Sequence, residues 1–180
     1  MLQKAENFAK LKHQGQLRAD KKTPYHSHLK QVVEQLKKMG VVDNDILCAG
    51  WLHDTIEDTS VDYDEIMKEF NENIADYVAS VTKDTRLVKV QQERQYVTQL
   101  GTAPWQSKVV KLADIIANFK DLPNGYEDKS IQDAKVKGKI PYIMAIKSEL
   151  VTRPETPHIE SALKTLNELL EKHNQDTMLF

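Results

Sequence analysis

Residues 46–58 read ILCAGWLHDTIED and place four ionisable side chains directly after the longest apolar run of the chain. Apolar residues recur in this stretch at intervals of three and four, which is typical of a helix with one face in the core. We expect this helix to begin near Asp43 or Asn44 and to continue through residue 58. The stretch therefore predicts a helix that carries charged groups beside the apolar core.

The four ionisable groups of this stretch are His53, Asp54, Glu57 and Asp58. Adjacent residues on a helix point about 100° apart, so His53 and Asp54 can converge on one ion. Glu57 and Asp58 each lie one turn beyond one member of this pair. Carboxylates packed this closely repel one another, and a bound metal ion removes the conflict. These residues alone leave open the alternative of a solvated acidic face beside a core histidine.

Two further segments supply groups of the same chemistry. His28 lies at the start of the preceding predicted helix, and Asp114 is a lone carboxylate on an apolar helical stretch, with Asn118 one turn later. An acidic residue in such a stretch is rarely buried unless it is paired or metal-bound. Antiparallel helices can bring His28 and Asp114 to the His53–Asp54 pair. Two imidazoles and two carboxylates suit six-coordinate Mn(II) or Fe(II) better than a thiolate-type zinc site.

Helical periodicity extends over almost the whole chain, and strand alternation is nearly absent. We expect an all-α fold, a single helical bundle over residues 1–180 without repeats or linkers. The expected helices are an opening one from residue 2, then 29–39, 62–70, 74–81, one ending at 100–101, one from 104, 142–150 and 157–173. The helix from 104 is expected to end in a turn at 123–125, and the last helix to have Thr156 as N-cap and Pro157 at N1.

Composition excludes several classes of protein. The 180 residues contain 25 Lys and Arg against 27 Asp and Glu, a net charge of −2, which argues against a nucleic-acid polymer or a membrane surface as partner. The single cysteine, Cys48, permits no intrachain disulfide and no thiolate zinc cage. No apolar run approaches the roughly 20 residues of a membrane span, and the charged N-terminus is unlike a signal peptide. We expect a cytoplasmic protein that is a monomer or homodimer.

The motifs resemble a known family. His28, the His53–Asp54 doublet and Asp114 are similar to the H…HD…D signature of HD-domain metal phosphohydrolases. Five segments resemble, in order and spacing, the hydrolase domain of RelA/SpoT enzymes: AKLKHQGQLR (9–18), TPYHSH (23–28), WLHDTIEDT (51–59), VTK (81–83) and VKLADIIAN (110–118). The length resembles the stand-alone small alarmone hydrolases, or metazoan SpoT homologues. The resemblance is strongest over residues 2–122 and loose in the C-terminal third.

The resemblance implies a single HD-type domain with Mn(II)-dependent removal of the 3′-pyrophosphate from guanosine tetra- or pentaphosphate. By the same resemblance, the metal ligands are His28, His53, Asp54 and Asp114. Glu57 and Asp58 match the pair that orients and activates the attacking water.

The resemblance also implies a set of substrate contacts. Arg18 matches a residue that packs against the base, Asn118 one near the ribose, and Lys89 a lysine that reaches the phosphates. The family usually has Lys after its Arg, but Ala19 follows here, so Lys21 or Lys22 is expected to replace that charge. Lys137, Lys139 and Tyr142 are further candidates that close over the phosphates from the C-terminal side.

Two other functions remain open at this point. One is an HD phosphohydrolase that removes a phosphate from another nucleotide, such as NADPH, and releases orthophosphate. The other is a non-catalytic alarmone-binding module. The intact segment His53 to Asp58 argues against the latter, because a pure binder has no need for a water-activating pair.

Overall fold

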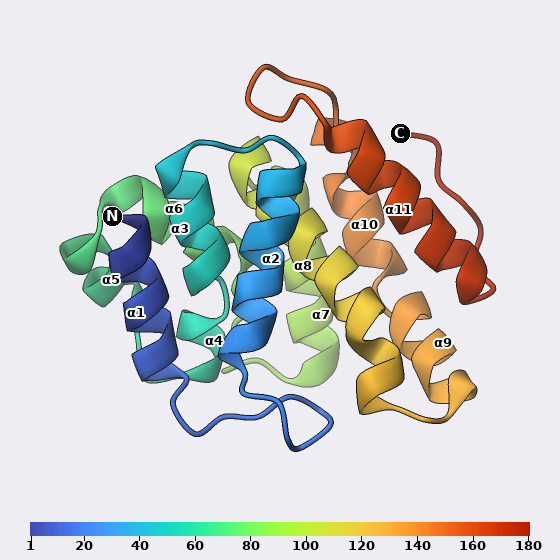
Figure 1. The fold of residues 1–180 in the computed structure, drawn as a ribbon, viewed down its shortest axis with the longest axis horizontal. Helices are drawn as coiled ribbons and strands as arrows, with labels where there is room; N and C mark the ends of the chain where they lie inside the picture. Colours follow the sequence, from blue (N-terminus) through green and yellow to red (C-terminus); the bar gives the residue numbers. More distant parts are fainter.

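The computed structural model describes all residues from 1 to 180 and is built from helices alone, apart from two isolated β-bridges (Figure 1). The helices are α1 (Leu2–Lys12), α2 (His26–Lys38), α3 (Asn44–Leu52), α4 (Thr55–Asp58), α5 (Tyr63–Glu69), α6 (Glu72–Val81), α7 (Lys89–Thr102), α8 (Trp105–Gly125), α9 (Lys129–Lys137), α10 (Ile140–Ile146) and α11 (Ile159–Lys172), with a 3₁₀ turn at Lys147–Glu149. The prediction of an all-α fold is confirmed. None of the helices combines the length and the apolar composition that a membrane span requires.

Helix α3 lies at the centre of the N-terminal half and contacts α1, α2, α6 and α8. All its residues from Ile46 to Leu52 are buried, as expected for a helix that is covered on every side. Gly50 permits the close approach of α2, because a Cβ atom there would lie 2.7 Å from Leu36 Cδ1. Helix α8 packs against α2, α3, α6 and α11, so it joins the two halves of the bundle.

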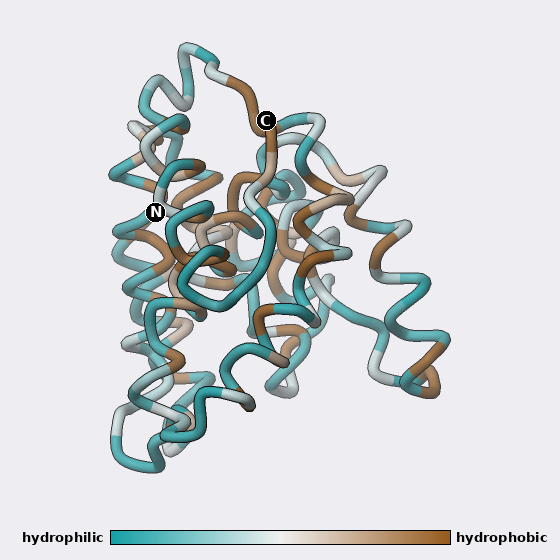
Figure 2. The backbone as a smooth tube through the Cα atoms, turned by 90° about the vertical axis from the view of Figure 1, so that its right-hand side faces the viewer, coloured by the Kyte–Doolittle hydropathy of each residue, from teal (hydrophilic) through white to brown (hydrophobic).

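The apolar residues of the helices form one continuous core of 41 buried side chains. Figure 2 shows the hydrophobic positions gathered inside the bundle, whereas the outer turns are hydrophilic. Burial of this surface is the main favourable contribution to folding. The same core fixes the positions of α2, α3 and α8, which carry the charged residues singled out in the sequence.

The prediction of one continuous helix through residue 58 is wrong, because α3 ends at Leu52 and a separate helix, α4, begins at Thr55. The Thr55 hydroxyl donates a hydrogen bond to the Leu52 carbonyl oxygen at 2.6 Å, so a side chain takes an acceptor that a continuous helix would use. Asp54 has φ −101° and ψ −2°, in the region between helix and strand. His53 and Asp54 therefore lie on a tight link rather than on a regular helix.

Other parts of the helix prediction differ as well. The helix expected over 142–150 begins at Ile140 and ends at Ile146, where the 3₁₀ turn follows. Helix α8 continues through Pro123 to Gly125, because a proline this near the C-terminus removes only one hydrogen bond. Helix α9 was not expected. The last helix begins at Ile159, with His158 and not Thr156 as its cap, because the His158 N–H donates to the Met39 carbonyl oxygen at 3.1 Å. That bond ties the segment before α11 to the end of α2.

Candidate active site

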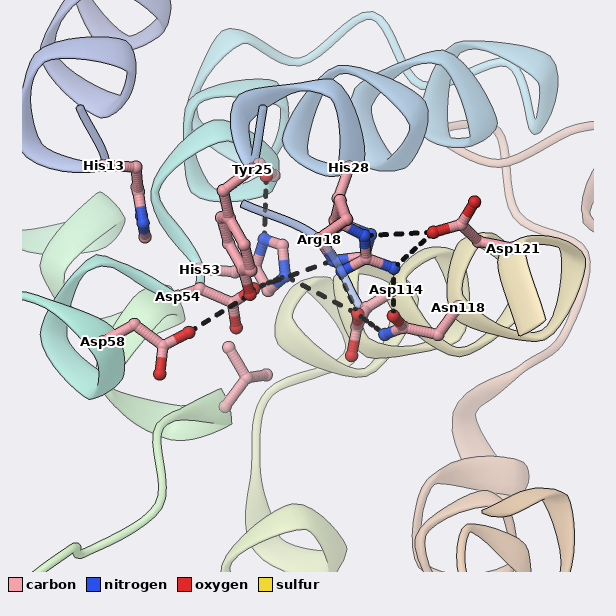
Figure 3. A network of polar contacts seen from close by, with 12 residues as sticks. His13, Arg18, Tyr25, His28, His53, Asp54, Asp58, Asp114, Asn118 and Asp121 are labelled. Carbon is pink, nitrogen blue, oxygen red and sulfur yellow. Dashed lines mark hydrogen bonds and ion pairs between the residues drawn. The ribbon is translucent and has the colours of Figure 1, made fainter. Parts of the chain in front are cut away.

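Three parts of the fold bring four side chains together (Figure 3). His28 comes from the first turn of α2, His53 and Asp54 from the link after α3, and Asp114 from the middle of α8. His28 Nε2 lies 3.1 Å from Asp114 Oδ1, and His53 Nε2 lies 2.9 Å from Asp54 Oδ2. The remaining cross distances are 3.6 Å from His53 Nε2 to Asp114 Oδ1 and 3.7 Å from His28 Nε2 to Asp54 Oδ2. The sequence-predicted ligand residues thus converge on one point.

The chemistry of this cluster fits a divalent cation. One ligand atom each of His28, His53 and Asp114 lies within 4.8 Å of the others, and all three residues are buried. His53 Nδ1 is 2.9 Å from the Gly50 carbonyl oxygen, which assigns the ring proton to Nδ1 and turns the Nε2 lone pair towards the carboxylates. His53 Nε2 is buried and has no well-aligned hydrogen-bond partner. Such an orphaned nitrogen among carboxylates suits a metal ligand.

The electrostatics of the cluster call for positive charge. Burial disfavours a protonated His53, but Asp54 and Asp114 outweigh burial and raise its pKa to about 10. Burial also favours protonated carboxyl groups, but the positive charge of Lys111 and the two neighbouring histidines hold the pKa of Asp114 well below its usual range. The carboxylates therefore stay ionised and favour a positive charge beside them. A metal ion can supply this charge in place of the proton on His53.

Asp114 is held from both sides. The buried ammonium of Lys111 lies 2.8 Å from its Oδ2 atom, and Asn118 Nδ2 donates to its Oδ1 atom at 2.5 Å. Lys111 belongs to the segment quoted in the sequence, but only the structure shows that it orients a carboxylate. A buried ion pair of this kind fixes geometry even where its net contribution to stability is small.

Glu57 and Asp58 lie on α4, beside the cluster. Glu57 Oε2 accepts a hydrogen bond from the Lys83 N–H at 2.9 Å, while partial burial raises the pKa of its carboxyl group. Partial burial of its carboxyl group is the main cause that raises the pKa of Asp58, and the nearby negative charge of Asp54 adds to it. The residue as a whole is nevertheless exposed. Both carboxyl groups thus have raised proton affinity, which suits groups that accept protons.

Tyr25 is a site residue that was not singled out from the sequence. Its hydroxyl group contacts Asp54 Oδ2 at 2.7 Å and Asp58 Oδ2 at 3.1 Å, so it links the cluster to α4. The ring stacks on His13, with ring centres 4.9 Å apart. The only signal in the sequence is its place in the TPY segment, three residues before His28.

A cavity of about 740 Å³ lies near the cluster: the four predicted ligands do not line it, but Tyr25 and Asn118 do, and they bond to Asp54 and Asp114. Its walls include four of the predicted substrate-binding residues, Arg18, Lys89, Asn118 and Tyr142, together with other basic, acidic and aromatic side chains. The remaining lining residues are Leu17, Ala19, Tyr25, Lys83, Glu93, Phe119, Asp121, Leu122, Gly125, Tyr126, Lys135, Gly138, Lys139 and Pro141. Five basic side chains face two acidic ones there, so the cavity favours an anionic ligand.

Arg18 is fixed at one wall of this cavity. Its Nε and Nη2 atoms both lie 3.0 Å from Asp121 Oδ2, and Nη2 donates to Asn118 Oδ1 at 3.0 Å. The guanidinium carbon lies 5.7 Å from the centre of the Tyr25 ring. Asp121 was not expected, and its pairing with Arg18 preorganises the planar guanidinium group.

Lys21 and Lys22 lie outside the cavity wall. Both are exposed on the loop between α1 and α2, and Lys21 has a left-handed backbone with φ +59°. Asp20 organises this loop by accepting hydrogen bonds from the N–H groups of Lys22 and Thr23 at 2.9 Å. The structure therefore does not bring these lysines to the other predicted substrate contacts.

Another part of the cavity wall contains a hydrogen-bonded group of Lys83, Glu93 and Tyr142. Lys83 Nζ lies 2.8 Å from Glu93 Oε1 and 2.7 Å from the Tyr142 hydroxyl, which also bonds to Glu93. Lys89 reaches the same Glu93 oxygen at 3.2 Å, although its side chain is 77% exposed. Lys83 belongs to the VTK segment of the resemblance but had no assigned role, and Glu93 carried no specific signal, because charged residues are common throughout this segment.

Comparison with known proteins agrees with this geometry. The family model described as the HD domain matches residues 5–140. The protein named guanosine-3′,5′-bis(diphosphate) 3′-pyrophosphohydrolase MESH1 of Xenopus tropicalis is 35% identical over 139 residues, which cover 74% of this chain and 78% of that protein. The protein of the same name in Homo sapiens is 36% identical over 138 residues, with 73% and 77% covered. The guanosine-3′,5′-bis(diphosphate) 3′-pyrophosphohydrolase of Aquifex aeolicus is 34% identical over 74% of this chain but only 19% of its own length.

Solved structures show the same relationship. A structure described as a metazoan ortholog of SpoT that hydrolyzes ppGpp matches with a TM-score of 0.80 and 25% identity, over 95% of this chain and 94% of that one. A protein of Listeria monocytogenes EGD-e matches with a TM-score of 0.59 at 23% identity, over 82% of this chain and 96% of that one, which shows a shared fold alone. The resemblance noted in the sequence is confirmed.

Proposed function

Because the chain belongs to the HD-domain family, we propose that it is a metal-dependent pyrophosphohydrolase that removes the 3′-pyrophosphate from guanosine tetra- or pentaphosphate. The observation that carries the proposal is the cluster of two histidines and two aspartates beside a basic cavity of about 740 Å³. The relatives named for this reaction support it, since two of them match over about three quarters of both chains.

The residues proposed to hold the metal are His28, His53, Asp54 and Asp114. Their nitrogen and oxygen donors suit Mn(II), which is the ion that we propose for this site. When bound, such an ion lowers the pKa of a coordinated water and offsets charge on phosphoryl oxygens. The Gly50 carbonyl group orients His53, and the ammonium group of Lys111 and the amide group of Asn118 orient Asp114.

Glu57 and Asp58 are proposed to activate the water. Each carboxylate is next to the cluster but outside the proposed ligand set, and each has a raised pKa. One of them accepts a proton as the water oxygen attacks the phosphorus atom bonded to the ribose 3′-oxygen. The bond from phosphorus to that oxygen breaks, the 3′-oxygen takes up a proton, and the products of the tetraphosphate are guanosine 5′-diphosphate and pyrophosphate.

The cavity wall supplies the substrate contacts. Arg18, held flat by Asp121, is proposed to pack against the guanine base, with Asn118 near the ribose. Lys89 and Tyr142 are proposed to contact phosphates at another part of the wall. Lys21 and Lys22 remain proposed contributors of long-range positive charge only, since they lie outside the cavity.

Hydrolysis of guanosine tetraphosphate by the purified protein with Mn(II) tests the proposal. We expect turnover that a chelator abolishes and that added Mn(II) restores, and no turnover by Asp54→Ala, which loses a ligand. Parallel incubation with NADPH separates the proposed activity from a phosphatase that releases orthophosphate. Tight binding of guanosine tetraphosphate without turnover by the metal-loaded protein would indicate a binding module instead.

A further inference from the structure

The basic residues of the cavity differ in whether an acid already balances them. Arg18 pairs with Asp121, and Lys83 and Lys89 share Glu93. Lys135 is exposed and lies over the Tyr126 ring, with its ammonium 4.4 Å from the ring centre. Lys139 is half-buried and forms no ion pair, because both acidic residues that line the cavity pair with other cations.

Lys139 belongs to a group of lysines around one aromatic ring. The ammonium groups of Lys139, Lys83 and Lys111 lie 4.9, 5.0 and 5.9 Å from the centre of the Tyr142 ring. Lys111 is neutralised by Asp114, one of the proposed metal ligands. The Tyr142 ring therefore connects the unpaired lysine to the metal cluster, and Lys139 lies on the side of the cavity where the reaction is proposed to occur.

The net charge of this part of the cavity indicates the charge of the ligand that it binds. Glu93 is the single carboxylate that balances three lysines here, Lys83, Lys89 and Lys139. The group therefore has an excess of two positive charges. Burial and the neighbouring charge of Lys111 lower the pKa of Lys139 to about 8. A half-buried cation under such repulsion is stabilised by an anion that carries at least two negative charges. A terminal phosphate has that charge near neutral pH.

We propose that Lys139 binds the terminal phosphate of the pyrophosphate group that the enzyme removes, with Lys83 beside it; this inference rests on the proposed function. In the C-terminal third, where the resemblance is loose, Lys139 is one of three candidates for contact with the phosphates, without a particular phosphate assigned to it. In this position the lysine neutralises the group that departs with the released pyrophosphate, so it contributes to binding of substrate and product alike.

Binding of inorganic pyrophosphate to Lys139→Met and Lys137→Met tests the inference without any need for turnover. Methionine keeps an aliphatic side chain over the Tyr142 ring and removes only the charge. Lys137 is an exposed lysine of α9 that does not line the cavity, so it is the matched control. By calorimetry, with and without Mn(II), we expect Lys139→Met to weaken pyrophosphate binding about 10- to 100-fold, Lys139→Arg to restore most of it, and Lys137→Met to bind as the parent does.

Amine labelling followed by mass spectrometry gives an independent readout on the unmodified protein. We expect pyrophosphate to protect Lys139 from an amine-reactive reagent and to leave Lys137 unprotected. Equal pyrophosphate affinity in the parent and Lys139→Met, or no protection of Lys139, would overturn the inference while leaving the proposed hydrolase intact. If the parent protein binds pyrophosphate through Lys139 but hydrolyses no guanosine tetraphosphate, the proposed function fails and the anion site stands.

Discussion

The Tyr25 hydroxyl is the contact through which the metal cluster and the water-activating carboxylates are linked. It lies 2.7 Å from Asp54 Oδ2 and 3.1 Å from Asp58 Oδ2, but it has one proton to donate. Tyr25→Phe removes this group and keeps the ring, which stacks on His13 and faces Arg18. The substitution therefore isolates the role of one hydroxyl.

The expected loss follows from the type of bond. A hydrogen bond to a charged group contributes about 1.5–3 kcal/mol, which corresponds to roughly a 10- to 150-fold change in rate if the bond orients the carboxylates for catalysis. We expect kcat on guanosine tetraphosphate to fall within that range. KM should change little, because the remaining cavity contacts are unaltered, and Mn(II) affinity should fall by no more than about tenfold.

Steady-state kinetics and metal titration of Tyr25→Phe measure these effects. Tyr63→Phe is the control, because it removes a hydroxyl that bonds to Asp76 at 2.8 Å on α6, away from the cluster. Unchanged kcat in Tyr25→Phe would refute the view that this hydroxyl positions Asp54 and Asp58. A fall in kcat matched by an equal fall in Tyr63→Phe would assign the effect to general stability.

Three further results are expected. Replacing Glu57 with Gln and Asp58 with Asn should reduce turnover by about 10²- to 10⁴-fold while Mn(II) and nucleotide still bind; loss of metal binding would make them ligands. Gly50→Ala should lower the free energy of unfolding by about 1–3 kcal/mol in denaturant titration, because its Cβ would lie 2.7 Å from a Leu36 methyl group, whereas Gly101→Ala, with nothing within 4 Å, should not destabilise. Hydrogen bonds from Lys129 and His173 lower the pKa of Asp133 to about 2, so its stabilisation is present above its ordinary value of 3.8 and is lost as the pH falls to about 2. Melting temperatures of Asp133→Asn should therefore depend less on pH across that range, and an identical acid dependence would contradict this linkage.

The fold class could be predicted because helical periodicity covers most of the chain. Two start signals with a side-chain acceptor are confirmed, Asp43 and Asp62, whose carboxylates cap α3 and α5 in the structure, whereas the predicted cap Thr156 is wrong. The break at His53–Asp54 could not be predicted from periodicity, since it depends on the Thr55 hydroxyl bonding to Leu52. The start of α11 depends on a bond from His158 to Met39, which is a contact between distant segments.

The proposed ligand set was accessible from the sequence because its residues are unusual for their surroundings. A carboxylate at position 114 on an apolar helix indicates a special partner, and His53–Asp54 follows a buried run. The acidic residues that hold the predicted substrate contacts in place were not accessible. Glu93 and Asp121 are ordinary charged residues in the sequence, and only the packing of α7, α8 and α10 around one cavity distinguishes them.

Hydrolysis of guanosine tetraphosphate in ¹⁸O-labelled water tests the central claim most directly. The protein is incubated with Mn(II) and the nucleotide, the products are separated, and their masses are measured by mass spectrometry. Attack by water on the phosphorus of the 3′-pyrophosphate predicts one ¹⁸O atom in the released pyrophosphate and none in guanosine 5′-diphosphate. Label in the nucleoside diphosphate, or release of orthophosphate in place of pyrophosphate, would contradict the proposed reaction.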